Sequence, residues 1–180
     1  AAVFSGHKMG GPRGAGLLWL RSGLPWESPM EGPQERRRRG GTEDLPAILG
    51  LAAAARRIPE RLDANEALAV LRDSLEEEVL HWDSAYEVVG KGRERLPNTS
   101  ALLLRGHEGE SVQMALDLAG FAVSTGSACH SGSVKPSHAI TSLGHPEAEA
   151  RSVIRVSLLP GATLPQVGRF LDTLRSILKR

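Results

Sequence analysis

The stretch AAVFSGHKMGGPRGAGLLWL, residues 1–20, decides how the N-terminal part of this 180-residue chain folds. An apolar run at 2–4 leads to Lys8, which is followed by turn residues rich in glycine and proline. A second apolar run begins at Leu17. Two short apolar runs separated by such residues are typical of strands joined by a tight connection. We therefore predict two strands over residues 1–21, joined by the lysine turn.

Lys8 stands close to Ser5 and His7 in this turn. A lysine held at the end of a strand beside polar neighbours is typical of an anchored, partly desolvated amine. Such an amine can form a Schiff base with a carbonyl cofactor. The same spacing also fits a surface lysine in a hairpin, so the spacing alone leaves both interpretations open.

The single cysteine of the chain, Cys129, lies in the stretch STGSACHSGS at 124–133. Its neighbours are small and hydroxylic and show no apolar periodicity, whereas a structural cysteine usually packs as a small hydrophobic residue. In a polar loop a thiolate can form and reach a reaction partner. A single cysteine cannot make an internal disulfide, so Cys129 is either incidental or reactive.

Taken together, these segments resemble the NifS/IscS-type cysteine desulfurases, pyridoxal-phosphate-dependent members of the class V aminotransferase family. SGHK at 5–8 and GGPRG at 10–14 resemble the cofactor-lysine segment, and GSAC at 126–129 resembles the persulfide-forming segment. The GSAC form with a long loop after it is similar to the NifS/IscS branch rather than the SufS-like branch. Further matches follow in the expected order: RGGT at 39–42, RLPNT at 95–99, EGES at 108–111, KPSH at 135–138 and IRVS at 154–157.

The resemblance implies an α/β fold, the C-terminal part of a pyridoxal-phosphate-dependent transferase of fold type I. It implies that residues 1–80 are the end of the large cofactor domain, with the lysine turn, an active-site loop and bridging helices. Residues 81–180 would form the small C-terminal α/β domain with the cysteine loop. The chain is less than half the family's usual length and begins without methionine inside an apolar run. We therefore expect a C-terminal fragment that is inactive alone.

For the cofactor, the resemblance implies that Lys8 forms the Schiff base with pyridoxal 5'-phosphate and later moves the proton at the substrate Cα. Ser5 and His7 would donate hydrogen bonds to the cofactor phosphate. Thr42 would stand at the start of a helix, where backbone N–H groups favour anions, and reach the phosphate of the other subunit. The resemblance thus implies a homodimer with shared sites.

For the substrate, it implies that Cys129 takes the sulfur of L-cysteine as a persulfide, leaving L-alanine. The sulfur would pass to an acceptor protein such as an iron–sulfur scaffold. Arg155 would hold the substrate carboxylate in a bidentate way that lysine cannot, unless it is a surface arginine at a strand edge. Asn98 would be structural or a weak substrate contact. Many family members have Gly-Arg where this chain has Leu-Pro at 159–160, which puts the local loop geometry in doubt.

Composition gives no sign of nucleic-acid or membrane binding. The formal net charge is +1, and the run of four arginines at 36–39 has no interleaved aromatic residues, so we interpret it as a solvated surface run. No signal-peptide pattern and no stretch of roughly 18 apolar residues occurs. One cysteine and no signal favour a reducing cytoplasm.

Three alternative functions remain open at this point. Selenocysteine lyase would use every residue named above. A catalytically inactive scaffold or sulfur-relay module would keep the fold without turnover. A metal site built from Cys129 with His130, His107 or His138 is disfavoured, because their spacing follows no zinc pattern, and we expect no metal.

Turn, capping and periodicity signals predict the remaining elements. Between residues 22 and 43 we expect a loop without structure of its own. Helices are expected from the Asp44 cap to about 57, after Pro59 with an apolar stripe at 68, 71, 75 and 79, over 110–119, over 137–143, and after a capping box of Thr163 and Gln166; strands are expected over 86–89, 101–104, 121–124 and 153–158.

Overall fold

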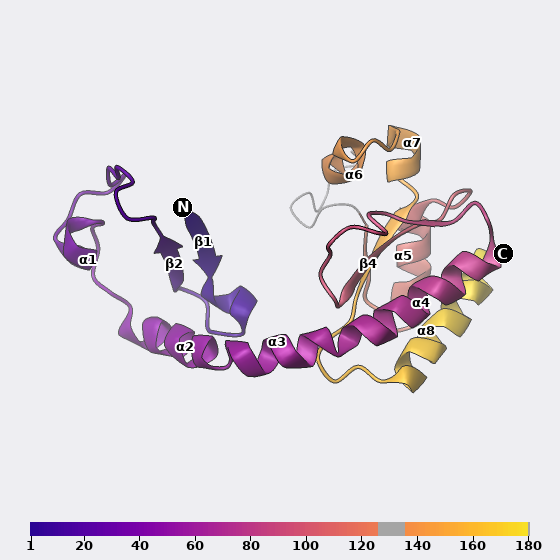
Figure 1. Cartoon of the computed structure of the whole chain (residues 1–180), viewed down its shortest axis with the longest axis horizontal. Helices are drawn as coiled ribbons and strands as arrows, with labels where there is room; N and C mark the ends of the chain where they lie inside the picture. The colour runs from indigo at the N-terminus through magenta and orange to yellow at the C-terminus, as the bar shows by residue number, and fades with distance from the viewer. Residues whose placement is uncertain (126–135, 180) are drawn as a thin grey trace. The chain divides into compact units, whose positions relative to one another are not determined.

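The computed structural model describes residues 1–125 and 136–179 (Figure 1). The chain divides into two compact units, Ala1–Leu62 and Asp63–Arg180. The predicted boundary at residue 80 concerned the domains of the family, and it stays a prediction. No helix in the described parts is both long and apolar enough to cross a bilayer.

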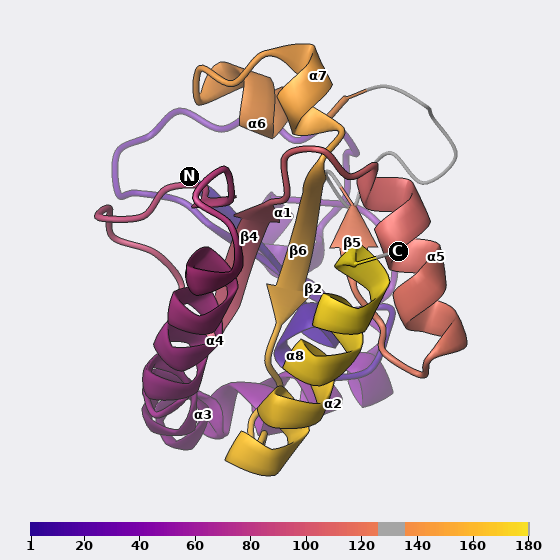
Figure 2. The ribbon, with the colours of Figure 1, turned by 90° about the vertical axis from the view of Figure 1, so that its right-hand side faces the viewer.

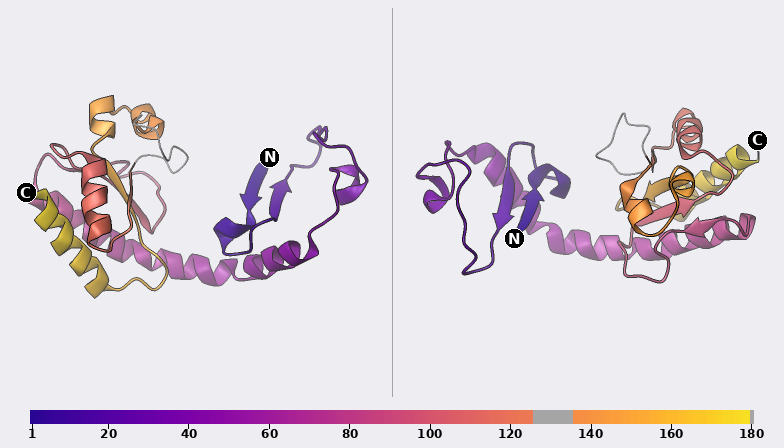
Figure 3. Two further views of the ribbon diagram at one scale, coloured as in Figure 1. Left: turned by 180° about the vertical axis from the view of Figure 1, so that it is seen from behind. Right: turned by 90° about the horizontal axis from the view of Figure 1, so that it is seen from above.

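The first unit begins with the predicted pair of strands. β1 (Ala2–Ser5) pairs antiparallel with β2 (Gly16–Trp19), and the 3-10 helix η1 (Gly6–Met9) follows β1 directly. Figure 3 shows this hairpin in indigo at the N-terminal end of the ribbon. The lysine turn is therefore confirmed, and Lys8 lies within η1.

Between the hairpin and the next helix, the stretch predicted to be a bare loop contains one short turn. α1 (Gln34–Arg37) has left-handed backbone angles at Glu35 and Arg36, with φ of 50° and 59°, so it is no regular helix. It is closed by an isolated antiparallel bridge between Gln34 and Arg39. The prediction of a loop without structure was wrong in this detail.

α2 (Leu45–Arg56) begins as predicted. The carboxylate of Asp44 accepts a hydrogen bond of 3.1 Å from the backbone N–H of Ala47, which satisfies one free donor of the first turn. A side chain on Gly11 of the lysine turn would come within 3.5 Å of the Cβ of Ala54. α2 thus packs closely against the turn that carries Lys8.

The helix predicted after Pro59 is divided in two. α3 (Ile58–Glu66) and α4 (Leu68–Trp82) are separated by a turn at Ala67. The predicted apolar stripe of α4 is confirmed, because Leu68, Leu75 and Val79 are buried and Leu71 is half-buried.

The second unit contains a four-stranded sheet in the order β3–β4–β6–β5, with every neighbouring pair antiparallel. β4, β6 and β5 are labelled in Figure 2. The strands are β3 (Glu87–Val88), β4 (Thr99–Leu103), β5 (Ser124–Thr125) and β6 (Val153–Ser157). β5 begins later than predicted because the N–H of Phe121 bonds to the carbonyl of Leu116 and so still caps the preceding helix.

One face of the sheet packs against α4, α5 (Gly109–Leu118) and α8 (Leu164–Leu178), and the main core lies between them. α8 begins with the predicted capping box of Thr163 and Gln166. The buried members of this core are Leu75, Val79, Val88, Leu102, Leu104, Val112, Leu116, Ile154, Val156, Val167, Phe170 and Leu174.

A smaller apolar cluster lies on the other face of the sheet. It joins α6 (His138–Ser142) and α7 (Glu147–Ala150) to the strands. We call residues 138–150 the α6–α7 lobe. α6 was predicted within a residue at each end, whereas α7 was missed. The cluster consists of Val89, Leu103, Ile140, Ala150 and Val153.

Candidate functional site

The lysine turn brings three predicted cofactor residues together. The Oγ of Ser5 lies 2.9 Å from Nδ1 of His7, and His7 and Lys8 follow each other in η1. The side chains of His7 and Lys8 are exposed, and only Gly6 of the turn is buried. The expected partial desolvation of the Lys8 amine is therefore wrong for this chain by itself, because the packed side of the turn is glycine backbone.

Backbone contacts fix the shape of this turn. The N–H of Gly6 donates to the carbonyl of Ala15, and the N–H of Gly11 donates to the carbonyl of Gly6, both at 2.9 Å. A Cβ on Gly6 would lie 2.7 Å from the Ala15 oxygen, so only glycine fits there. The guanidinium of Arg61, on α3, donates to the carbonyl of Met9.

Thr42, expected at the start of a helix, lies two residues before the cap of α2 and is exposed. Its neighbours are ordered by Arg39, which donates hydrogen bonds of 2.9 and 2.7 Å to the carbonyls of Gly40 and Gly41. The cap carboxylate of Asp44 already accepts from the helix terminus.

The predicted nucleophile, Cys129, and its neighbour His130 lie outside the described residues. The described chain stops at β5 on one side of residues 126–135 and resumes just before α6 on the other.

Arg155 lies on β6, an inner strand of the sheet, with Ala101 of β4 and Ser124 of β5 as its register partners. Its position on an inner strand excludes the alternative of an arginine at a strand edge. It is half-buried, and no carboxylate among the described residues lies within 4.0 Å of its guanidinium. Because strand residues alternate between faces, Arg155 shares the face of Val153, toward the α6–α7 lobe.

Asn98 ties β4 to the end of β6. Its amide donates to the carbonyl of Leu158 at 3.0 Å, and its backbone carbonyl accepts from the N–H of Leu158 at 2.8 Å. The hydroxyl of Thr99 donates to its side-chain oxygen at 3.2 Å. These bonds favour the structural role over the substrate contact.

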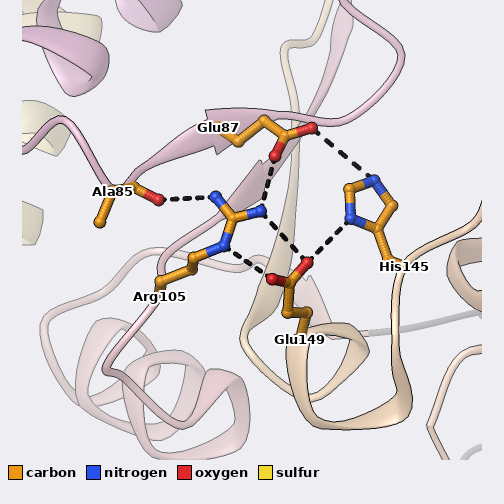
Figure 4. A network of polar contacts seen from close by, with 5 residues as sticks. All are labelled: Ala85, Glu87, Arg105, His145 and Glu149. Atoms are coloured by element: carbon orange, nitrogen blue, oxygen red, sulfur yellow. Dashed lines mark hydrogen bonds and ion pairs between the residues drawn. The ribbon is translucent and has the colours of Figure 1, made fainter.

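A network of charges at the lobe, drawn in Figure 4, was not predicted from the sequence. The guanidinium of Arg105 donates two bonds to Glu149, at 2.9 and 3.1 Å, one to Glu87 at 2.8 Å and one to the carbonyl of Ala85 at 2.8 Å. His145 lies 3.1 Å from Glu149 and 3.7 Å from Glu87. The hydrogen bonds from Arg105, and then from His145, lower the pKa of Glu149 to about 2. Hydrogen bonds to Glu149 and Glu87 raise the pKa of Arg105.

A second ion pair was also missed. Glu76 of α4 is buried, and Arg95 donates to its two oxygens at 2.7 and 3.0 Å. The hydrogen bond to Glu76 raises the pKa of Arg95. The first residue of the RLPNT segment therefore anchors the connection before β4 to α4.

A scan against protein families matches residues 1–170 to the family described as "Aminotransferase class-V". The chain belongs to the class V aminotransferase family. Among curated proteins it is 41% identical over 175 residues to "Cysteine desulfurase" of Cereibacter sphaeroides, covering 96% of this chain and 44% of that protein. It is 40% identical over 176 residues to "Cysteine desulfurase" of Rhodobacter capsulatus, covering 97% and 46%. The chain thus spans less than half the length of these relatives.

Two solved structures of NifS-like proteins superpose on this chain. A "NIFS-LIKE PROTEIN" superposes with a TM-score of 0.78 at 28% identity, covering 98% of this chain and 45% of that one. The NifS-like protein from Rickettsia africae ESF-5 superposes with a TM-score of 0.81, also at 28% identity, covering 99% and 47%. The predicted α/β fold, as part of a larger fold type I structure, is confirmed.

Proposed function

We propose that the protein to which this chain belongs removes the sulfur of L-cysteine with the aid of pyridoxal 5'-phosphate. The products would be L-alanine and a persulfide on Cys129. One observation carries this proposal: nearly the whole chain aligns, at 41% and 40% identity, with relatives named cysteine desulfurase. The contact between Ser5 and His7, next to Lys8 on one turn, supports it chemically.

The donors of the lysine turn suit the proposed cofactor. A hydroxyl and an imidazole 2.9 Å apart can both donate to one phosphate group, and the exposed amine of Lys8 can bind an aldehyde carbon. When bound, the cofactor supplies an electron sink for negative charge at the substrate Cα. Once free, the amine of Lys8 would move the proton at this carbon.

The sulfur step balances without a further oxidant. The thiolate of Cys129 attacks the sulfur of L-cysteine, so a sulfur–sulfur bond forms and the carbon–sulfur bond of the substrate breaks. The electron pair stays with the substrate carbon, which takes up a proton and ends as the methyl group of alanine. The thiol of Cys129 becomes a persulfide, while Arg155 holds the substrate carboxylate through its planar guanidinium.

Three further expectations belong to the same proposal. The persulfide would pass to an acceptor protein such as an iron–sulfur scaffold. Thr42 would serve the site of a second subunit in a homodimer. The protein would work in the cytoplasm, where thiols stay reduced.

The test uses the longest gene product that contains this chain, supplied with pyridoxal phosphate and L-cysteine. Borohydride reduction should attach the cofactor to Lys8, and Lys8→Ala should remove this adduct while Lys91→Ala keeps it. Cys129→Ser should keep the adduct but lose alanine release, because a hydroxyl cannot accept the sulfur. Alanine release at the wild-type rate from Cys129→Ser would contradict the proposal.

A further inference from the structure

Among the described residues, the α6–α7 lobe makes few apolar contacts with the rest of the second unit. α6 has five residues and α7 has four, and helices this short are not stable alone. The lobe contributes only Ile140 and Ala150 to the small apolar cluster beneath it. The position of the lobe on the sheet therefore depends strongly on the charges at its end.

Arg105 supplies most of the side-chain polar contacts between the described strands and the lobe. It follows β4 by two residues. Its side chain contacts Ala85 in the segment before β3, Glu87 of β3 and Glu149 of α7 (Figure 4). The two parallel bonds to Glu149 fix orientation as well as distance, because guanidinium and carboxylate are both planar. One side chain thus ties the strands to the lobe.

The lobe also lies beside two parts of the proposed site, the sheet face that carries Arg155 and, in sequence, the segment that contains Cys129. It packs on the face of the sheet that Arg155 shares with Val153. It is the first described structure after residues 126–135, which contain Cys129. On the other side of this segment, Gln113 of α5 holds Val123 and Thr125 by bonds of 3.2 and 3.0 Å.

We propose that Arg105 is a positioning residue, which clamps the α6–α7 lobe to the sheet and so fixes the chain that leads out of residues 126–135. Its role in sulfur transfer rests on the proposed function, but the clamp itself does not. Neither Arg105 nor Glu149 belongs to a segment that carries the resemblance to the family, so this clamp adds to the site residues expected from it.

The test compares Arg105→Met with Arg72→Met by hydrogen exchange and mass spectrometry on this chain. Arg72 is a matched control, because like Arg105 it contacts two carboxylates, those of Asp73 and Glu76, and a backbone carbonyl, that of Leu96, but it lies on α4 and not at the lobe. We expect exchange over residues 138–150 to rise about tenfold or more in Arg105→Met only, with α8 changed equally in both variants.

A second measurement follows the reaction of Cys129, the only cysteine of the chain, with a maleimide under native conditions. Its rate should change about threefold or more in Arg105→Met and stay at the wild-type value in Arg72→Met, with Arg105→Lys in between. If Arg105→Met does not fold, Glu149→Gln replaces it, because this change keeps the shape of the side chain and removes its charge.

Two results would overturn the clamp. One is exchange over 138–150 that rises no more than exchange in α8, and the other is an equal rise over 138–150 in Arg72→Met. Neither measurement needs cofactor or L-cysteine. A failed desulfurase assay would therefore leave the clamp standing, and a failed clamp would leave the desulfurase proposal standing.

Discussion

At the scale of single residues, Ser100 is the most conspicuous misfit in the core. It lies on β4 with 2% of its surface exposed, and its Oγ has no hydrogen-bond partner among the described residues. Its neighbour on the same face of the strand, Leu102, is fully buried in the main core. A hydroxyl in such surroundings has lost its bonds to water without replacement.

We expect Ser100→Ala to raise the free energy of unfolding by about 1 kcal/mol, because it removes the unpaired hydroxyl. Urea denaturation of the second unit, followed by circular dichroism, measures the change. Ser157→Ala is the control: this exposed serine lies on the same sheet and should change stability by less than about 0.5 kcal/mol. A destabilised Ser100→Ala variant would mean that the hydroxyl has a partner in solution.

At the scale of elements, α7 depends on the ionised form of Glu149. The pKa of Glu149 is lowered to about 2, so this carboxyl binds a proton less readily in the folded state than in the unfolded chain. A carboxyl whose pKa is lowered by folding stabilises the folded state at pH values above the ordinary carboxyl pKa. This stabilisation is lost as the pH falls through the pKa of the folded state.

We therefore expect the protection of α7 against hydrogen exchange to fall between about pH 4.5 and pH 2, as protonation breaks the bonds of Glu149 to Arg105. In Glu149→Gln the protection should be lower at pH 7 and nearly independent of pH across this window. Because the pair is partly exposed, 0.5 M salt should weaken the effect. If Glu149→Gln loses the protection of α7 over the same pH range as the wild type, the transition comes from another group.

The elements also show which features can be predicted from the sequence and which cannot. The cap at Asp44, the capping box at Thr163 and the lysine turn were predicted because each signal is local, within a few residues. Arg105 and Glu149 are 44 residues apart, and no periodicity connects them. Lys8 and Cys129 stood out from their local sequence, whereas the roles of the other site residues came only from the resemblance to a family. The exposure of Lys8 could not be predicted, because burial depends on what packs against the turn.

At the scale of the whole molecule, the two units differ in the buried side chains that stabilise each of them. Every member of the two apolar clusters belongs to the second unit. In the first unit the buried apolar side chains are only Ala47 and Ala54, while Val3 is 81% and Trp19 is 52% exposed. A two-stranded hairpin with exposed apolar residues has little stability of its own.

We expect backbone amides of β1 and β2 to exchange about tenfold or more faster than those of β4 and β6 in the isolated chain. Limited proteolysis should likewise cut within residues 1–62 first and leave a fragment that starts near α4. Hydrogen exchange at each strand, measured at pH 7, tests whether β1 and β2 are less protected than β4 and β6. Equal protection of the two sheets would show that the first unit has a source of stability besides its own contacts.

The position of β6 in the middle of the second sheet has a consequence for synthesis on the ribosome. β6 is the last of the described strands in chain order, yet both β4 and β5 pair with it. While residues 153–157 are still in the exit tunnel, β5 has no partner strand and the inner edge of β4 stays open. The second unit therefore completes its sheet only after residues 153–157 have left the tunnel, and a nascent chain paused before this point exposes an unpaired strand to its neighbours.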